Sequence, residues 1–116
     1  MQTALIELSS NSFRLTVSDG MHNVLQRNHH LGLAARVSVN GAFTQPDIDE
    51  ATFVAKELTY AAENFGYDQI MVVATEAFRL ASNGEKVAEH ISLSTGHEVR
   101  ILSEVEETGL AWEAIS

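Results

Sequence analysis

Apolar and polar residues alternate along the first thirty positions of the chain, and this pattern predicts strands. Residues 4–8 are mostly apolar, and residues 13–18 alternate strictly, which is the period of a half-buried strand. Asp19-Gly20 then predicts a tight hairpin turn, because both residues tolerate positive φ. Residues 23–29 can return as a third strand. We therefore expect an antiparallel meander, with the polar turn Ser9–Ser12 between its first two strands.

The middle of the chain predicts one long helix. Residues 31–43 are punctuated by glycine and are expected to be irregular. Thr44 then offers an N-cap, and Asp47 at the third helical position completes a short capping box. Apolar residues recur at helical spacing from about Gln45 to Phe65, and Gly66 follows as a stop.

The last third of the chain predicts strands and helices in alternation. The expected elements are a strand at Ile70–Ala74 that is covered on both faces, a helix at Thr75–Leu80, a helix at Gly84–Ser94, a strand at Glu98–Leu102 and a last helix capped by Ser103. The order βββαβαβα predicts an α/β fold. Its mixed sheet of about five strands, three antiparallel and then parallel, has helices on both faces.

Charge and composition narrow the classes of function. The chain has 116 residues, which suits one domain, and no cysteine, which excludes a disulfide scaffold and a thiol nucleophile. Seven basic residues face sixteen acidic ones, for a net charge of −9. This balance argues against binding to duplex nucleic acid or to a membrane surface. No apolar run approaches the ~20 residues that cross a bilayer, and a cytoplasmic protein is expected.

Polar residues gather where the predicted parallel strands end. Ligands of such sheets lie outside the carboxyl ends of the strands, here Ala74-Thr75 and Leu102-Ser103, and the Ser9–Ser12 turn can lie beside them. The hydroxyls and N–H groups of this turn could cradle a phosphate. The alternative is an ordinary hairpin turn with Asn11 at positive φ.

Two further features could carry chemistry, and each has a structural alternative. Arg79 follows a buried strand and could clamp an oxyanion, or it could be a solvated surface arginine. Glutamates 104, 106 and 107 could orient a water molecule, or they could simply complement the helix dipole. The adjacent His29 and His30 would point to opposite faces of a strand, so we do not expect a metal site there.

The order of three stretches gives these features a context. Residues 6–15 (IELSSNSFRL), 73–83 (VATEAFRLASN) and 101–107 (ILSEVEE) resemble the exopolyphosphatase / guanosine pentaphosphate phosphohydrolase family. The corresponding family motifs are I-D-x-G-S-N-S-x-R-L, A-T-x-A-x-R-x-A-x-N and I-S-G-x-E-E-A. The resemblance spans essentially the whole chain, and its middle motif is the most specific.

The resemblance implies an actin-like, ribonuclease H-like fold of two similar halves, of which residues 1–116 would form a single N-terminal half-domain. It implies hydrolysis of the terminal phosphoanhydride of polyphosphate or of guanosine pentaphosphate, with Mg²⁺. Glu106 would be the catalytic base that activates water. Arg79 and the loop residues Ser10, Asn11 and Ser12 would bind phosphate.

Three departures from the family motifs favour an alternative. Glu7 stands where the family has an aspartate, which would place a longer carboxylate near the metal; Ser9 and Glu104 replace glycines. A diverged, non-catalytic member that binds a phosphorylated ligand or a protein partner would also fit. Half of a sugar kinase fits less well, because such proteins usually show D-x-G-T-T/S at the first loop. For the isolated chain we predict no turnover, and an exposed cleft wall could cause self-association.

Overall fold

The structure, a computed structural model, describes residues 1–115. The strands of this part of the chain are β1 (Thr3–Leu8), β2 (Ser12–Ser18), β3 (Asn23–His30), β4 (Gln69–Ala74) and β5 (Val99–Ile101). Its helices are α1 (Leu33–Asn40), α2 (Gln45–Phe65), α3 (Glu76–Leu80), α4 (Gly84–Thr95) and α5 (Glu104–Ile115). Every strand and every helix predicted from the sequence is present, and α1 is an addition.

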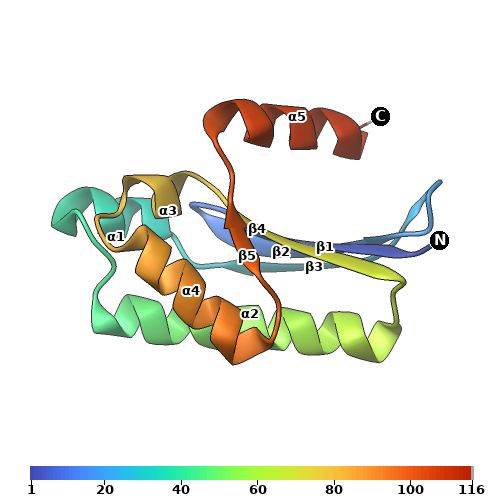
Figure 1. The fold of residues 1–116 in the computed structure, drawn as a ribbon, viewed down its shortest axis with the longest axis horizontal. Helices are drawn as coiled ribbons and strands as arrows, with labels where there is room; N and C mark the ends of the chain where they lie inside the picture. Colours follow the sequence, from blue (N-terminus) through green and yellow to red (C-terminus); the bar gives the residue numbers. More distant parts are fainter. Residues whose placement is uncertain (116) are drawn as a thin grey trace.

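One mixed sheet organises the molecule, with the strand order β3-β2-β1-β4-β5. The meander β1-β2-β3 is antiparallel, while β1 pairs with β4 and β4 pairs with β5 in parallel. Figure 1 shows α2 and α4 on one face of the sheet and α5 on the opposite face. The predicted α/β class and the helices on both faces are confirmed.

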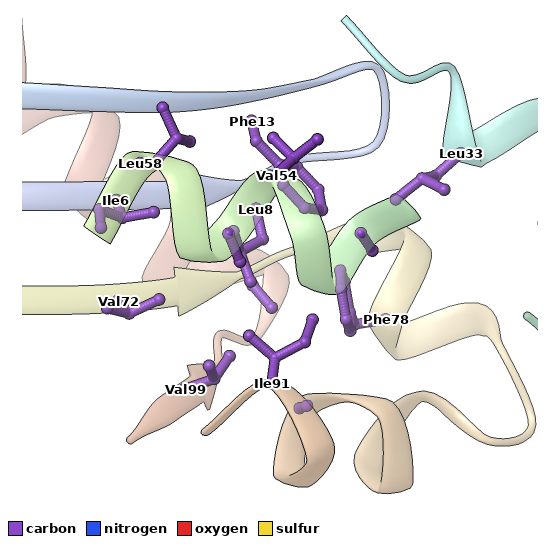
Figure 2. Packing of buried hydrophobic residues seen from close by; sticks show 14 of the residues in the cluster. Ile6, Leu8, Phe13, Leu33, Val54, Leu58, Val72, Phe78, Ile91 and Val99 are labelled. Carbon is purple, nitrogen blue, oxygen red and sulfur yellow. The ribbon is translucent and has the colours of Figure 1, made fainter. Parts of the chain in front are cut away.

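The core lies between the sheet and the helices α2 and α4, which cover one of its faces. Every second residue of β1 and β2 is buried, so these two strands turn one apolar face toward the helices. Figure 2 shows their side chains meeting those of α2, α3 and α4. The largest fully buried side chains are Phe13, Phe78, Ile6, Leu8, Leu15, Leu33, Ile91, Val17, Val54 and Val73.

The expectation of an irregular segment at residues 31–43 is wrong, because α1 occupies most of it. Two glycines in the left-handed conformation bracket this helix, Gly32 at φ 69° and Gly41 at φ 73°. The helix buries Leu33 and Val37 against the core. With eight residues it is too short to be stable by itself, so packing rather than local propensity explains why it forms.

The predicted capping box at the start of α2 is confirmed. The Thr44 N–H donates to the Asp47 carboxylate at 2.9 Å, and the Asp47 N–H donates to the Thr44 hydroxyl at 3.4 Å. Arg36 of α1 also donates to Asp47, at 3.2 Å. Burial by itself raises the pKa of Asp47, but the hydrogen bonds from Thr44 and Arg36 outweigh it and leave the pKa lowered.

The prediction that β4 is covered on both faces is correct only for its second half. Val72, Val73 and Ala74 are buried, whereas Gln69 is exposed and Met71 is 47% exposed. The buried end of β4 is the end that leads into α3. The C-terminal half of this strand is therefore the part that lies in the core.

A polar latch fixes the connection between α3 and α4. The Asn83 side chain accepts from the Phe43 N–H at 2.9 Å and donates to the Phe43 carbonyl at 2.9 Å. The Phe43 ring packs on Phe78 of α3, with ring centroids 4.9 Å apart. At Gly84, a Cβ would lie 1.8 Å from the Phe78 carbonyl oxygen, so only glycine fits there. These contacts hold α3, which carries Arg79, at the rim of the sheet.

Candidate functional site

A cleft lies at the rim of the sheet where β1 and β4 end. The turn after β1, the start of α3 and the start of α5 meet there, as the order of the motifs led us to expect. The Thr75 N–H donates to the Leu8 carbonyl at 3.2 Å, which joins the ends of the two strands. The residues that line the cleft are Glu7, Ser9, Ser10, Asn11, Ser12, Arg14, Thr75, Glu76 and Glu107.

The polar turn of this cleft is held from two sides. The Ser10 hydroxyl accepts a hydrogen bond from the Ala77 N–H of α3 at 3.2 Å. The Asn11 carbonyl accepts from the N–H groups of Leu31 and Gly32, at 2.9 and 3.0 Å. Segments distant in the sequence therefore fix the turn before any ligand arrives. A turn fixed in this way loses little conformational entropy on binding.

The backbone of the turn is unstrained. No residue other than glycine adopts positive φ in the part of the chain that the structure describes. The alternative expectation of positive φ at Asn11 is therefore wrong. Ser9, which replaces a family glycine, also avoids the left-handed region, and its N–H donates to the Ser12 carbonyl at 3.1 Å. This departure from the family motif carries no backbone penalty.

Glu7 and Arg14 lie opposite each other on neighbouring strands, and both line the cleft. Cross-strand neighbours have Cβ atoms about 5 Å apart, so the two side chains share one region of the rim. Arg14 is exposed, and within residues 1–109 no carboxylate lies within ion-pair distance of its guanidinium. Arg14 is thus a cation that the cleft can offer to an anion.

Arg79 lies next to the cleft but is not among the residues that line it. Its Nη1 donates to the Leu102 carbonyl at 2.7 Å and to the Glu107 carboxylate at 3.0 Å. The side chain is 24% exposed, so it is neither the solvated surface arginine of the structural alternative nor an open anion clamp. It connects α3 to the start of α5.

The two adjacent glutamates of α5 have different surroundings. Glu106 accepts from the Ser103 N–H at 3.0 Å, its own N–H donates to the Ser103 hydroxyl at 3.1 Å, and its carboxylate pairs with Arg100. The Ser103 backbone hydrogen bond is the main cause of its lowered pKa, and Arg100 adds to it. Glu107 is the glutamate that lines the cleft. Consecutive helical residues point about 100° apart, so only one of the two can face it.

Glu107, Glu76 and Thr75 line the cleft. The sequence named Glu107 only as one of three glutamates that could orient a water molecule, and it gave no role to Glu76 or to the Thr75 side chain. One available signal was the spacing Ser103-x-x-Glu106, which is itself a capping box. A glutamate at that position is expected to bond back to the cap residue, so Glu107, the next glutamate, is the one not used in capping. Glu76 had no comparable signal, because its orientation depends on how α3 leaves the sheet.

Comparison with known structures gives this fold a class. The chain superposes on the Aquifex aeolicus member of the Ppx/GppA protein family with a TM-score of 0.83 at 31% identity, covering 92% of this chain and 36% of that one. An exopolyphosphatase from Cytophaga hutchinsonii gives a TM-score of 0.86 at 19% identity, covering 95% and 36%. The ethanolamine utilization protein EutJ from Carboxydothermus hydrogenoformans gives 0.50 at 11% identity, covering 86% and 44%.

The sheet order and these neighbours define an actin-like, ribonuclease H-like fold. Residues 14–116 match the Ppx/GppA phosphatase family. The chain belongs to that family. It spans about a third of the length of the family structures on which it superposes.

Proposed function

We propose that residues 1–116 form the first half of the phosphate-binding cleft of an exopolyphosphatase-type phosphohydrolase. The substrate would be linear polyphosphate or guanosine pentaphosphate, and the bond cleaved would be its terminal phosphoanhydride. The observation that carries this proposal is the convergence, at one rim, of a preformed hydroxyl-rich turn, an arginine and a helix-borne carboxylate. Membership of a phosphatase family supports it.

The turn and Arg14 would bind the terminal phosphoryl group. Ser10, Asn11 and Ser12 offer hydroxyl, amide and backbone donors, and Arg14 adds a planar cation in the same lining. Arg79, the arginine that the family motif assigns to phosphate, pairs with Glu107 at 3.0 Å. In phosphoryl transfer, such groups act by stabilising the negative charge on the equatorial oxygens.

A carboxylate would orient the attacking water and accept its proton. The family motif places this role on Glu106, whereas the position of Glu107 in the lining of the cleft supports Glu107. The Glu106 carboxylate is already engaged by Ser103 and Arg100. We therefore propose Glu107 as the base, with Glu106 as the alternative.

The carboxylates of the cleft fit a magnesium ion that arrives with its substrate. Within the described residues no group of three or more acidic or histidine side chains is arranged to hold a metal ion. Mg²⁺ is commonly held by one or two carboxylates together with substrate phosphates. Glu7, the predicted metal contact, and Glu76 line the cleft and could supply these carboxylates. The ion would neutralise charge on the transferred phosphoryl group.

Glu7 and Glu104 favour the alternative of a non-catalytic binding member. With Glu76 and Glu107, Glu7 gives the cleft three carboxylates against Arg14 as its lining cation, which weakens its attraction for a polyanion. Such a member would bind a phosphorylated ligand or a protein partner without turnover.

A cytoplasmic location and self-association of the chain remain predictions.

The test measures phosphate release from polyphosphate and from guanosine pentaphosphate with Mg²⁺. It uses a protein that contains these residues together with the second half of the fold. Glu107→Gln is expected to lower kcat by at least about 100-fold, the usual contribution of a general base, and Glu106→Gln to lower it much less. The reverse order would assign the base to Glu106. No release from either substrate would leave the binding alternative, and turnover by residues 1–116 alone would contradict the half-cleft proposal.

A further inference from the structure

Arg79 is the side chain that ties the start of α5 to the rest of the molecule. Its guanidinium donates to the carbonyl of Leu102, the buried residue that leads out of β5, and to the carboxylate of Glu107, one turn into α5. These two acceptors lie on either side of the Ser103 cap. One cation thus holds both the entry to the helix and its first turn.

The other polar contacts of this helix start are local. Glu106 bonds to Ser103 and Arg100, and the Glu107 N–H bonds to the Ser103 carbonyl at 2.9 Å. Among residues 1–109, whose side chains the structure describes, Arg79 alone reaches α5 from outside residues 100–115 through a hydrogen bond or ion pair. In Figure 1, α5 lies across the sheet from α2 and α4, joined to β5 by a short connection. Within residues 1–109, Arg79 therefore adds the side-chain contact that places this first turn, next to the buried Leu102, whose N–H donates to the Ala74 carbonyl at 2.8 Å.

We propose that Arg79 is a positioning residue that holds Glu107 at the cleft. One nitrogen of the guanidinium, Nη1, donates to both the carbonyl and the carboxylate, and the planar group fixes the direction of its two N–H groups. A lysine ammonium could reach both acceptors but would not fix that direction. This role deepens the proposed function and rests on it, because Glu107 matters only if the cleft binds or cleaves phosphate. It differs from the direct phosphate contact that the motif suggests for Arg79.

Hydrogen exchange of the backbone amides measures the positioning role without any ligand. Arg79→Gln is expected to speed exchange of the Glu107 amide and its neighbours in the first turns of α5 about tenfold, the effect of losing a charged hydrogen bond. Arg79→Lys should restore part of the protection, and Glu107→Gln should cause a smaller increase. Arg27→Gln is the matched control, because Arg27 is exposed on β3 and its one hydrogen bond goes to the neighbouring Gln26 carbonyl.

Exchange in the first turns of α5 that is equally fast in Arg79→Gln and Arg27→Gln would overturn the positioning role. Exchange of the amides of β1 and β4 reports global unfolding. If exchange of these amides is also faster in Arg79→Gln, this variant is globally destabilised. The conservative variants Arg79→Lys and Glu107→Gln then provide the test. Unchanged α5 exchange in both conservative variants would then overturn the proposal as well.

The salt dependence of tripolyphosphate affinity provides a readout that a purely structural role would not move. Removing an arginine that contacts phosphate releases fewer counterions on binding and flattens the dependence of affinity on salt. We expect Arg14→Gln to flatten it, and Arg79→Gln to weaken binding while leaving the slope as in Arg27→Gln. A flattened slope in Arg79→Gln would overturn the assignment in favour of direct contact. If wild type does not bind tripolyphosphate, the proposed function fails in this chain, and the exchange experiment still decides whether Arg79 holds α5.

Discussion

The Asn83 latch yields the sharpest stability prediction. Asn83 belongs to the most specific of the three motifs, yet it does not line the cleft. Its side-chain amide makes two hydrogen bonds of 2.9 Å with the backbone of Phe43, forty residues earlier in the chain. Replacing Asn83 with alanine removes both bonds and leaves the N–H and the carbonyl of the buried Phe43 unpaired.

The size of the effect follows from these two bonds. A hydrogen bond contributes a net ~0.5–1.5 kcal/mol, and a buried partner left unsatisfied costs about 1–3 kcal/mol. Asn83 itself is half-buried, so water can reach part of the vacated space. We therefore expect Asn83→Ala to lower the free energy of unfolding by about 2–3 kcal/mol. This is a large share of the ~5–15 kcal/mol that stabilises a typical domain.

Urea denaturation followed by circular dichroism tests this prediction. The transition midpoint of Asn83→Ala should fall while the m-value stays constant. Asn64→Ala is the matched control, because Asn64 is exposed on α2 and alanine there should add up to about 0.5 kcal/mol of helix propensity. A loss below 0.5 kcal/mol in Asn83→Ala (an order-of-magnitude threshold, roughly the effect of an ordinary surface substitution) would refute the latch.

Two further predictions concern backbone packing and acid stability. Gly84→Ala is expected to cost at least about 2 kcal/mol, because the new Cβ meets the Phe78 carbonyl oxygen, while Gly109→Ala, with nothing within 4 Å, should be neutral or stabilising; thermal melts of the two variants compare them. The pKa of Asp47 is lowered in the folded state, so its contribution to stability is present above its unfolded pKa of about 3.9 and is lost as pH falls through the folded value. Unfolding free energies measured between pH 7 and pH 3 should therefore fall less in Asp47→Asn than in wild type, and equal losses would contradict this linkage.

Local patterns predicted most of the fold because they agree with what the core requires. The alternation in β1 and β2 matches their buried faces, and the Thr44-x-x-Asp47 box begins α2 at the expected residue. The helix α1 could not be predicted in this way. Its sequence has no N-cap side chain, and it forms because Leu33 and Val37 reach the core between two left-handed glycines. That information lies in the tertiary packing.

The candidate site was likewise predictable in part. The order of the motifs predicts that three distant stretches share one rim, because parallel strands end at the same edge of a sheet. Which way each side chain points was not predictable. Glu106 is turned into its capping box and Glu107 toward the cleft, and Arg79 bonds to Glu107 and Leu102. A single residue of helical rotation changes which carboxylate reaches the cleft, and a motif alone does not fix that rotation.

The proposed function depends on phosphate binding at the rim of the sheet. It is tested most directly by following the backbone amide resonances of the 116-residue chain during titration with tripolyphosphate and Mg²⁺. We expect saturable shifts centred on residues 9–12, on Thr75 and on Glu107, which Arg14→Gln weakens strongly and Arg27→Gln leaves unchanged. Shifts that do not saturate, or that centre on another part of the molecule, would contradict it.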